Sequence, residues 1–386
     1  MERRRSVLLL PGQGAQRERM AAGLYEAREE FTAPMDEFFG RLGTTGARLR
    51  SAWLRPAPNP ELDESAVAQP LLLAVGHALG RAVGAAAEPP ALLLGHSVGE
   101  LAAACLAGVF DPADIGALAA ARSRSLEGTG HGGMLAVAAS EGQLAEELGG
   151  FGDGLAVGAD GVAVGADEVA VGADGTDVGA NGVAVAGVAE RAVFAGVAVA
   201  ALNGPRQTVL AGPREALAAV EQHLRDRGIL VRALRSGHAF HSPVMAGAAL
   251  RFGEALAGFG PRAPRAAAGT VVSTRTGVAV TEDQARDPHF WGGQLAAPVR
   301  YWPALRELLD TLGRRPGLLL LDGSADRSLS APARHHPAVR EGASEVVPLL
   351  AVGRDAGGPA DARVFAEALH RLGEQRDHTG DHTVVS

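Results

Sequence analysis

A serine held between two glycines is the first feature of this sequence that could do chemistry. Gly95-His96-Ser97-Val98-Gly99 follows a short apolar run at 91–94 and precedes an alanine-rich segment. This G-x-S-x-G pattern is typical of a nucleophile elbow, in which a strand turns sharply into a helix and exposes the serine hydroxyl. A Cβ at either glycine would collide with neighbouring backbone. The helix N-terminus would direct free amides toward an oxyanion beside Ser97. The segment therefore predicts a nucleophilic serine.

Two histidines three residues apart, His238 and His241, precede a predicted helix. Metal binding would need a third ligand, and no nearby Cys, His or acidic cluster in the sequence supplies one. A loop histidine that is far in sequence from a nucleophilic serine is suited to act as its general base. His335 and His336, in contrast, are interpreted as a surface pair. The pattern favours a general base for the serine over a metal ligand.

Two further segments could contribute to such a site. The glycine-rich turn at 11–16 follows the first predicted strand, and ligands of α/β proteins bind at the carboxyl ends of strands. It is neither a G-x-G-x-x-G motif nor a P-loop, but Gln13 could offer its backbone amide or its side chain to a substrate carbonyl. Arg122 and Arg124 lie on a predicted helix, where base rates favour a solvated face.

Composition narrows the class of protein. The chain has 386 residues, enough for one large or two ordinary domains with a sizeable core, and 47% are hydrophobic. A net charge of −8 gives no reason to expect nucleic acid or an anionic membrane as partner, and all 36 basic residues are arginine. The single cysteine, Cys105, excludes an internal disulfide and is expected in the core. No segment approaches a membrane span of ~20 apolar residues, and the N-terminal apolar run is too short for a signal peptide. The expected location is the cytoplasm.

The elements that must position these residues alternate between strands and helices, which indicates an α/β fold. Strands are predicted at 7–10, 91–94, 134–138, 197–203, 207–211, 229–234, 269–274 and 317–321, the last being the final core strand. Helices are predicted at 23–39, 67–85, 98–107, 112–127, 141–148, 214–227, 304–312 and 362–372.

The order β-α-β-β-α-β between 132 and 236 predicts a small ferredoxin-like domain inserted in a larger one. The larger domain would comprise 1–131 and 237–350, followed by a C-terminal helix and tail at 351–386. A seven-residue repeat at about 151–196 has glycine where a helix would need other residues. It is interpreted as an expanded loop of the small domain without a catalytic role.

Eight stretches, taken in order and spacing, resemble the malonyl-CoA:acyl-carrier-protein transacylase family, and especially the acyltransferase domains of polyketide synthases. They are PGQGAQ at 11–16, VAQP at 67–70, GHSVGE at 95–100, ARSRSLE at 121–127, GHGGMLAV at 130–137, LNGPRQTVLAG at 202–212, GHAFHSPVM at 237–245 and WGGQLAAPVRY at 291–301. The resemblance covers roughly 5–350 and leaves only the repeat out of place. It implies an α/β-hydrolase-like large domain and a ferredoxin-like small domain, with the active site between them.

The resemblance also assigns roles to individual residues. It implies that Ser97 is the acylated nucleophile and His241 its general base, with the backbone amides of Gln13 and Val98 as the oxyanion hole. Arg122 matches the arginine that holds the free carboxylate of the malonyl group, for which a planar guanidinium is well suited. Three more residues complete the implied site: the main-chain carbonyl of Gln294 orients the histidine, His96 lines the pocket, and Phe240 in the HAFH loop accompanies selection of malonyl over methylmalonyl.

The function implied is malonyl-CoA:acyl-carrier-protein S-malonyltransferase, working by ping-pong acyl transfer without a cofactor in polyketide or fatty acid biosynthesis. The partners implied are malonyl-CoA and a phosphopantetheinylated acyl carrier protein, whose usual acidity favours an arginine-bearing rim. No ketosynthase or carrier domain is recognisable, so a discrete, trans-acting acyltransferase is expected.

Other functions remain open. A hydrolase that clears acyl groups from carrier proteins, or an enzyme moving acyl chains between carriers, would use the same serine and histidine. The hydrolase would have no use for a cation at Arg122. Phe240 and Arg122 together argue against the enzyme that moves acyl chains between carriers. A non-catalytic docking module would not need the intact Ser97 and His241. A serine esterase would need an acidic residue to complete a triad, and the sequence does not identify one. One departure from the family pattern, the missing proline after Asp322, puts the backbone at 322–326 in doubt.

Overall fold

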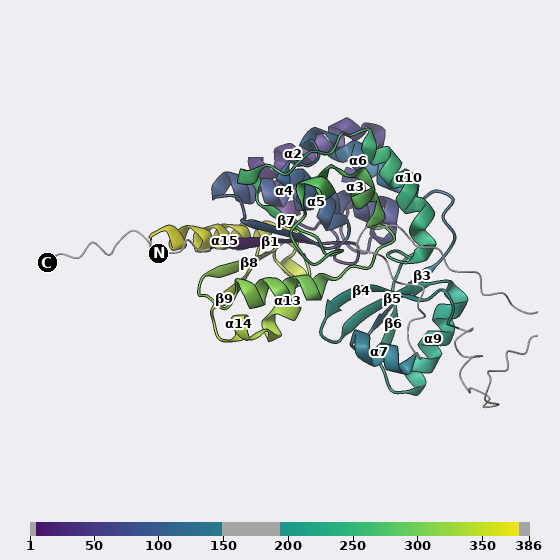
Figure 1. Cartoon of the computed structure of the whole chain (residues 1–386). Helices are drawn as coiled ribbons and strands as arrows, with labels where there is room; N and C mark the ends of the chain where they lie inside the picture. The colour runs from purple at the N-terminus through teal and green to yellow at the C-terminus, as the bar shows by residue number, and fades with distance from the viewer. Residues whose placement is uncertain (1–4, 149–193, 378–386) are drawn as a thin grey trace, which may run out of the picture.

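The computed structural model describes residues 5–148 and 194–377. Almost all of the repeat at about 151–196 lies outside these residues. The described part is built on two β-sheets, a parallel one and an antiparallel one (Figure 1).

The parallel sheet has five strands in the order β7-β2-β1-β8-β9. These strands are β1 (Ser6–Leu10), β2 (Leu92–Gly95), β7 (Thr270–Val272), β8 (Leu318–Asp322) and β9 (Ser344–Pro348). In β1, Leu8 and Leu10 pack into one apolar cluster while Val7 and Leu9 pack into another on the opposite face. Because both faces are covered, the central strands are continuous apolar runs, which is why the sequence pattern found them.

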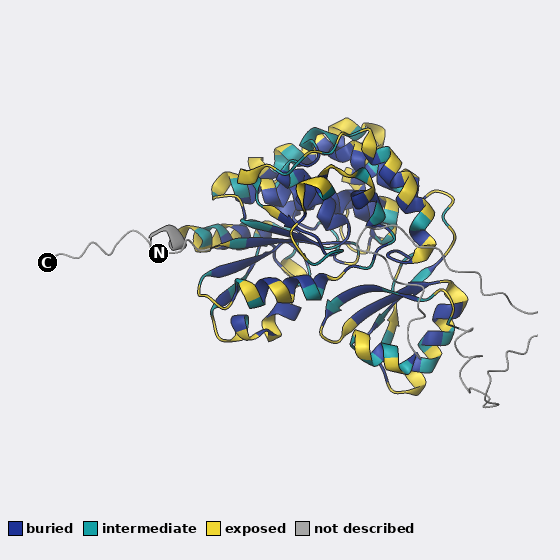
Figure 2. Cartoon of the chain, in the orientation of Figure 1, coloured by how far each residue is buried: buried dark blue, intermediate teal, exposed yellow. Residues whose placement is uncertain are grey.

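Helices cover both faces of this sheet (Figure 1). The layer on the face of Leu8 and Leu10 contains α2 (Glu29–Leu42), α4 (Ser65–Ala86), α5 (Val98–Ala107), α6 (Ile115–Ser125) and α10 (Ala246–Ala257). The other face carries α13 (Tyr301–Thr311) and α14 (Pro337–Arg340). Shorter or peripheral helices are α1 (Ala22–Tyr25), α3 (Thr44–Leu54), α11 (Glu282–Arg286), α12 (Pro288–Gly293) and α15 (Pro359–Asp377). Figure 2 shows the central strands dark blue between helices whose outer faces are yellow.

Contrary to the expectation that no segment approaches a membrane span, one described helix, α4, is long and apolar enough to cross a membrane by length and composition alone. However, 89% of its most apolar window is buried inside the protein. It is therefore the central helix of the core.

The antiparallel sheet has the order β4-β5-β3-β6. Its elements follow along the chain as β3 (Gly133–Val137), α7 (Glu141–Glu147), β4 (Ala198–Gly204), β5 (Gln207–Gly212), α9 (Arg214–Asp226) and β6 (Val231–Ala233). One face packs under α7 and α9. The other meets the large unit, where the amide of Leu202 donates to the carbonyl of Val299. The described elements have the predicted β-α-β-β-α-β order.

Several sequence-based expectations are wrong, and one of them is the single helix expected at 23–39, which is divided into α1 and α2. The strand at 317–321 is not the final one of the sheet, because β9 pairs with it in parallel. This edge strand is only partly buried and includes Ser344 and Glu345, so it lacks the apolar run of the inner strands. The helix predicted at 112–127 consists of a 3₁₀ turn, Pro112–Asp114, followed by α6.

Another wrong expectation concerns His336, which is buried instead of forming a surface pair with His335. Its Nδ1 accepts the amide of Ala338 at 3.2 Å and so caps α14. The backbone after Asp322, in contrast, is well supported without the proline. The Asp322 carboxylate accepts the amides of Ser324 at 2.8 Å and Ser330 at 3.2 Å.

Candidate active site

The nucleophile elbow has the predicted form. Ser97 stands between β2 and α5 with φ 52° and ψ −119°, a backbone conformation that non-glycine residues rarely adopt. A Cβ on Gly95 would overlap the backbone of Gly99 and Glu100, and one on Gly99 would overlap the carbonyl oxygen of Leu10. The two glycines therefore allow the tight approach of strand and helix that raises the Ser97 side chain.

Ser97 and His241 are brought together from positions 144 residues apart, with 2.8 Å between Oγ and Nε2. The other ring nitrogen, Nδ1, lies 2.9 Å from the carbonyl oxygen of Gln294 and 3.0 Å from that of Ala297. Because carbonyls only accept hydrogen bonds, Nδ1 carries the proton and Nε2 is free to accept from the serine hydroxyl. Two main-chain carbonyls thus take the place of the acid of a triad. The sequence pointed to Gln294 but missed Ala297.

The environment of His241 keeps it neutral. Burial, followed by the nearby charges of His96 and Arg122, lowers the pKa of His241 to about 3. His241 also adopts a left-handed backbone, with φ 62°, and its amide donates to the carbonyl of Leu295 at 2.8 Å. The imidazole is therefore neutral and rigidly held at ordinary pH, the protonation state that a general base must have before reaction.

The predicted oxyanion donors lie on both sides of the elbow. Val98 is the first residue of α5, where backbone amides are not used within the helix. Gln13 follows Gly12, which packs so closely on the elbow that a Cβ there would lie 2.5 Å from the carbonyl oxygen of His96. Within 5–148 and 194–377, neither the Gln13 nor the Val98 amide has a hydrogen-bond partner. Both are available to a substrate oxygen.

Arg122 is buried on α6, against the base-rate expectation of a solvated face, whereas Arg124 is exposed. Its Nε donates to Oε1 of Gln69 at 2.8 Å, and its guanidinium lies 5.7 Å from the Phe252 ring centroid. Both terminal nitrogens, Nη1 and Nη2, are buried and lack a partner among the described residues. Burial lowers the pKa of Arg122 to about 10 against the opposing charge of Glu100, so the side chain stays cationic at neutral pH.

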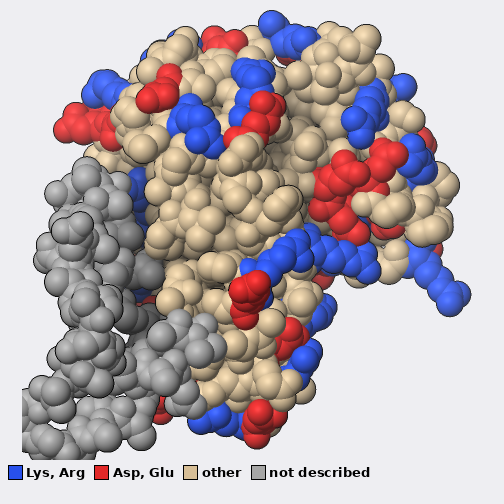
Figure 3. Space-filling model, turned by 90° about the vertical axis from the view of Figure 1, so that its right-hand side faces the viewer, with Lys and Arg blue, Asp and Glu red and all other residues tan. Residues whose placement is uncertain are grey.

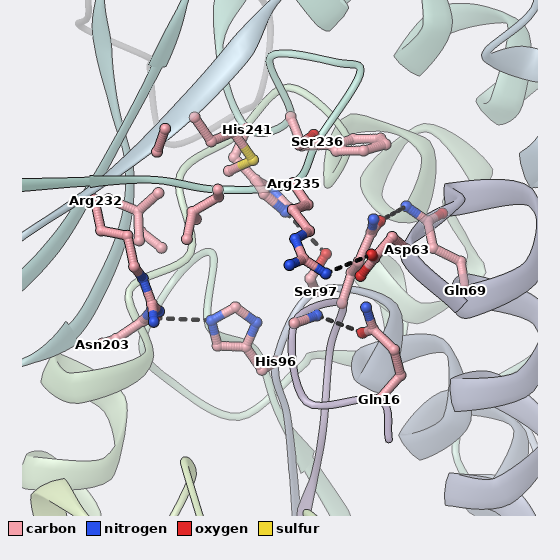
Figure 4. Close-up of a pocket in the computed structure, with 18 of the residues that line it drawn as sticks. Gln16, Asp63, Gln69, His96, Ser97, Asn203, Arg232, Arg235, Ser236 and His241 are labelled. Atoms are coloured by element: carbon pink, nitrogen blue, oxygen red, sulfur yellow. Dashed lines mark hydrogen bonds and ion pairs between the residues drawn. The ribbon is translucent and has the colours of Figure 1, made fainter. Parts of the chain in front are cut away.

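A cavity of about 540 Å³ opens between the two sheets (Figure 4), and neither Arg122 nor Val98 is among the residues that line it. Ser97, His241, Gln13 and Phe240 line it, and Gln69 forms the wall that hydrogen-bonds to Arg122 behind it. His96 and Asn203 line its other side, with 2.8 Å between His96 Nε2 and Asn203 Oδ1. His96 is a lining residue, as predicted, and burial lowers its pKa.

The cavity walls also carry charge. Arg17 pairs with Asp326 at 2.7 Å, and Arg235 pairs with Asp63 at 2.8 Å. Arg232 completes the arginines lining the cavity. In Figure 4, Arg235 reaches toward Asp63 above Ser97. Two of these three positive charges are therefore balanced by carboxylates.

Sequence reasoning gave Glu100 no role, although it lies one turn after Ser97. Its carboxylate is buried and accepts hydrogen bonds from the amide of Thr274 at 2.6 Å and from the hydroxyls of Thr274 and Ser273. Burial raises the pKa of Glu100 despite these bonds. The signal available was an acidic residue in the first turn of an otherwise apolar helix.

Cys105 lies in the core, as the sequence predicted. Cys105 is buried and free, and its pKa is raised by burial, so the thiol is unreactive. Within the described part of the chain, no group of three or more His, Cys, Asp or Glu side chains could hold a metal ion.

A protein-family model matches most of the chain. Residues 7–149 and 173–314 match the family model described as acyl transferase domain. A phenolphthiocerol/phthiocerol polyketide synthase of Mycobacterium tuberculosis is 29% identical over 334 residues, which are 86% of this chain and 19% of that protein. The chain thus spans about a fifth of the length of this curated relative.

Solved structures have the same fold. The acyl transferase domain of SpnD, in complex with 2-(pent-4-yn-1-yl)malonyl, is 26% identical with a TM-score of 0.74, covering 97% of this chain and 77% of that one. The malonyl CoA-acyl carrier protein transacylase of Coxiella burnetii is 21% identical with a TM-score of 0.70, covering 96% of this chain and 98% of that one. At that identity the likeness concerns the fold alone.

Proposed function

The chain belongs to the acyl transferase domain family, and on this premise we propose that it transfers a malonyl group from malonyl-CoA to the phosphopantetheine thiol of an acyl carrier protein. The observation that carries this proposal is Arg122, a buried cation whose two terminal nitrogens lack partners in the described structure. An unpaired buried charge is costly, and a substrate carboxylate would satisfy both nitrogens in a planar, two-point contact. The pathway would be polyketide or fatty acid biosynthesis.

The first half-reaction uses the serine and the histidine. Nε2 of His241 takes the hydroxyl proton as Ser97 Oγ attacks the thioester carbonyl carbon. The amides of Gln13 and Val98 stabilise the resulting oxyanion. When the carbon–sulfur bond breaks, His241 returns its proton to the departing coenzyme A sulfur, leaving a malonyl ester on Ser97.

The second half-reaction is the reverse with a different thiol. The carrier's phosphopantetheine thiol gives its proton to His241, and its sulfur attacks the ester carbonyl. The ester bond to Oγ breaks, and His241 reprotonates Ser97. No cofactor or metal is needed in either half.

Selection of the acyl group would combine two features. Arg122 favours a carboxylated acyl chain over acetyl, and the same cation has no use in a hydrolase for simple acyl groups. Phe240 is buried in the cavity wall, where its ring would occupy the space of a 2-methyl branch. Because one methyl group is worth ~1–3 kcal/mol in such a pocket, discrimination against methylmalonyl should be moderate.

The carrier protein would approach the cavity from its arginine-bearing side. Arg17, Arg232 and Arg235 line the cavity, and Figure 3 shows basic side chains in a row on one face of the molecule. An acidic carrier would be attracted to exposed arginines beside the cavity. Acidic side chains lie close to these arginines, so charge would affect both the orientation and the affinity of the bound carrier protein.

The architecture fits a two-domain interpretation of the family. The β-α-β-β-α-β unit supports a ferredoxin-like small domain at 132–236, inserted into an α/β-hydrolase-like large domain at 1–131 and 237–350. Residues 351–386 would form the C-terminal helix and tail. The cytoplasm remains the expected location.

The test is intact-protein mass spectrometry after brief incubation with an equimolar mixture of malonyl-CoA, methylmalonyl-CoA and acetyl-CoA. A malonyl adduct is expected on the wild-type protein and none on Ser97→Ala. Release of free acid from acyl-carrier thioesters, without a malonyl adduct, would favour an editing hydrolase and overturn the proposal.

A further inference from the structure

Three side-chain hydrogen bonds connect Arg122 to the loop that carries the oxyanion donor. Nε of Arg122 donates to Oε1 of Gln69 at 2.8 Å. Nε2 of Gln69 donates to Oε1 of Gln13 at 2.8 Å, and Nε2 of Gln13 donates to the hydroxyl of Ser65 at 3.1 Å. The three bonds link α6, α4 and the loop at 11–16. We call them the amide relay.

The direction of the amide relay is fixed at one end. A guanidinium can only donate hydrogen bonds, so Gln69 must turn its carbonyl oxygen toward Arg122. Its amide group then faces Gln13, which must turn its own oxygen toward Gln69 and its amide toward Ser65. The orientation of both glutamines therefore follows from the charge at Arg122.

Gln69 is the central residue of the amide relay, and both polar atoms of its side chain are hydrogen-bonded. It is buried on α4 and also lines the cavity that contains Ser97. Its bond to Nε leaves Nη1 and Nη2 of Arg122 as the only uncommitted donors of the guanidinium in the described structure. Its bond to Gln13 holds the side chain of the residue whose backbone amide is directed toward the substrate carbonyl. Gln69 thus contacts the supports of both ends of a malonyl thioester.

We propose that Gln69 is a positioning residue that sets acyl selectivity, because its acceptor oxygen orients the carboxylate-binding Arg122 while its amide group separately supports the oxyanion loop. The proposal rests on the malonyl transfer proposed above. A malonyl group is short and has one carboxylate and one thioester carbonyl. Orienting Arg122 matters for the carboxylate, which an acetyl group lacks, whereas supporting the loop matters for the thioester carbonyl, which both acyl groups have.

Two matched substitutions separate the two links of the relay. Gln69→Met keeps a side chain of similar length but removes both bonds, so Arg122 and the loop lose their common support. Gln13→Met removes the bond between Gln13 and Gln69 and keeps the one between Gln69 and Arg122. A general packing defect would affect both variants alike, whereas the relay predicts different selectivities.

The experiment measures the rate of seryl-ester formation by rapid-quench mass spectrometry, separately with malonyl-CoA and acetyl-CoA. For Gln69→Met we expect the malonyl-to-acetyl ratio of kcat/KM to fall at least tenfold. For Gln13→Met we expect both rates to fall while the ratio stays within threefold of wild type. Thermal unfolding of each variant checks that the protein is folded.

A third variant, Gln69→Glu, keeps the acceptor for Arg122 but places an anion against it. It should lower the malonyl-to-acetyl ratio further than Gln69→Met, because the arginine is then neutralised before substrate binds. An unchanged ratio in folded Gln69→Met and Gln69→Glu would overturn the inference while leaving malonyl transfer intact. Failure of the wild-type protein to form a malonyl ester would instead overturn the proposed function, and the inference with it.

Discussion

Replacing Arg122 by methionine should abolish malonyl selection and leave the fold nearly as stable. Burial lowers the pKa of Arg122 from 12.5 to about 10, which means that the folded protein disfavours the cation by about 3 kcal/mol at neutral pH. Methionine removes that cost and roughly fills the volume. It also removes the hydrogen bond to Gln69 and the contact with Phe252, which together contribute a comparable amount. The free energy of unfolding should therefore change by no more than about 1 kcal/mol.

The catalytic effect should be much larger. Two hydrogen bonds from a guanidinium to a carboxylate contribute about 1.5 kcal/mol or more each, so their loss should lower kcat/KM for malonyl-CoA by a factor of about 100 or more. Acetyl-CoA has no carboxylate and should lose far less. The proportion of acetyl ester on Ser97 should therefore rise in a competition experiment followed by intact-protein mass spectrometry.

The assay has two refuting outcomes. Malonyl ester formation by Arg122→Met at a rate near that of wild type would show that the guanidinium does not hold the carboxylate. A loss of more than about 3 kcal/mol in chemical denaturation would show that Arg122 is a structural residue whose charge is well satisfied. Arg124→Met, at an exposed position on the same helix, is the matched control and should change neither quantity.

The remaining predictions concern pH, specificity and the elbow. Because burial lowers the pKa of His241 to about 3, the folded protein binds fewer protons than the unfolded chain between pH 3 and 6.5. His241 should therefore lower the free energy of unfolding by about 1.4 kcal/mol for each pH unit below 6.5, as measured by chemical denaturation. Ester formation in a single turnover should be similar at pH 6 and pH 7.5, and a loss of rate with an apparent pKa near 6.5 would contradict the assignment. Phe240→Ala should raise the methylmalonyl-to-malonyl ratio of kcat/KM by about tenfold or more, and an unchanged ratio would remove the ring from the specificity argument. Gly99→Ala should destabilise the protein by several kcal/mol in thermal or chemical unfolding because its Cβ would overlap the carbonyl oxygen of Leu10, and near-normal stability would show that the elbow can relax.

Local patterns predicted the features that depend on neighbouring residues. The inner strands were recognisable because both of their faces are buried, and the elbow because its glycines are required by close backbone contacts. The edge strand β9 was missed because it contains the buried, hydrogen-bonded Ser344 and the partly exposed Glu345, and so has no apolar run. An edge strand with polar residues and a loop have similar amino-acid compositions, so composition alone could not show that 344–348 form a strand.

Parts of the site were not predictable for a different reason. The carbonyl of Ala297 orients His241 through the main chain, and a main-chain group leaves no mark on residue type. Gln69 was visible as part of a family motif, but its role depends on a hydrogen bond to Arg122 from another helix. The sequence pointed to Ser97, His241 and Arg122 as candidates, whereas the residues that support them became visible only in three dimensions.

The backbones of Ser97 and His241 have a consequence for protein engineering. Both residues have positive φ, at 52° and 62°, which costs a non-glycine residue of order 1 kcal/mol or more. Glycine has no such penalty, so Ser97→Gly should be both inactive and harder to unfold than the wild type. Catalytic activity and the stability of the fold would then have opposite requirements at position 97. A Ser97→Gly protein would be a durable, non-turning-over form for capturing complexes with carrier proteins.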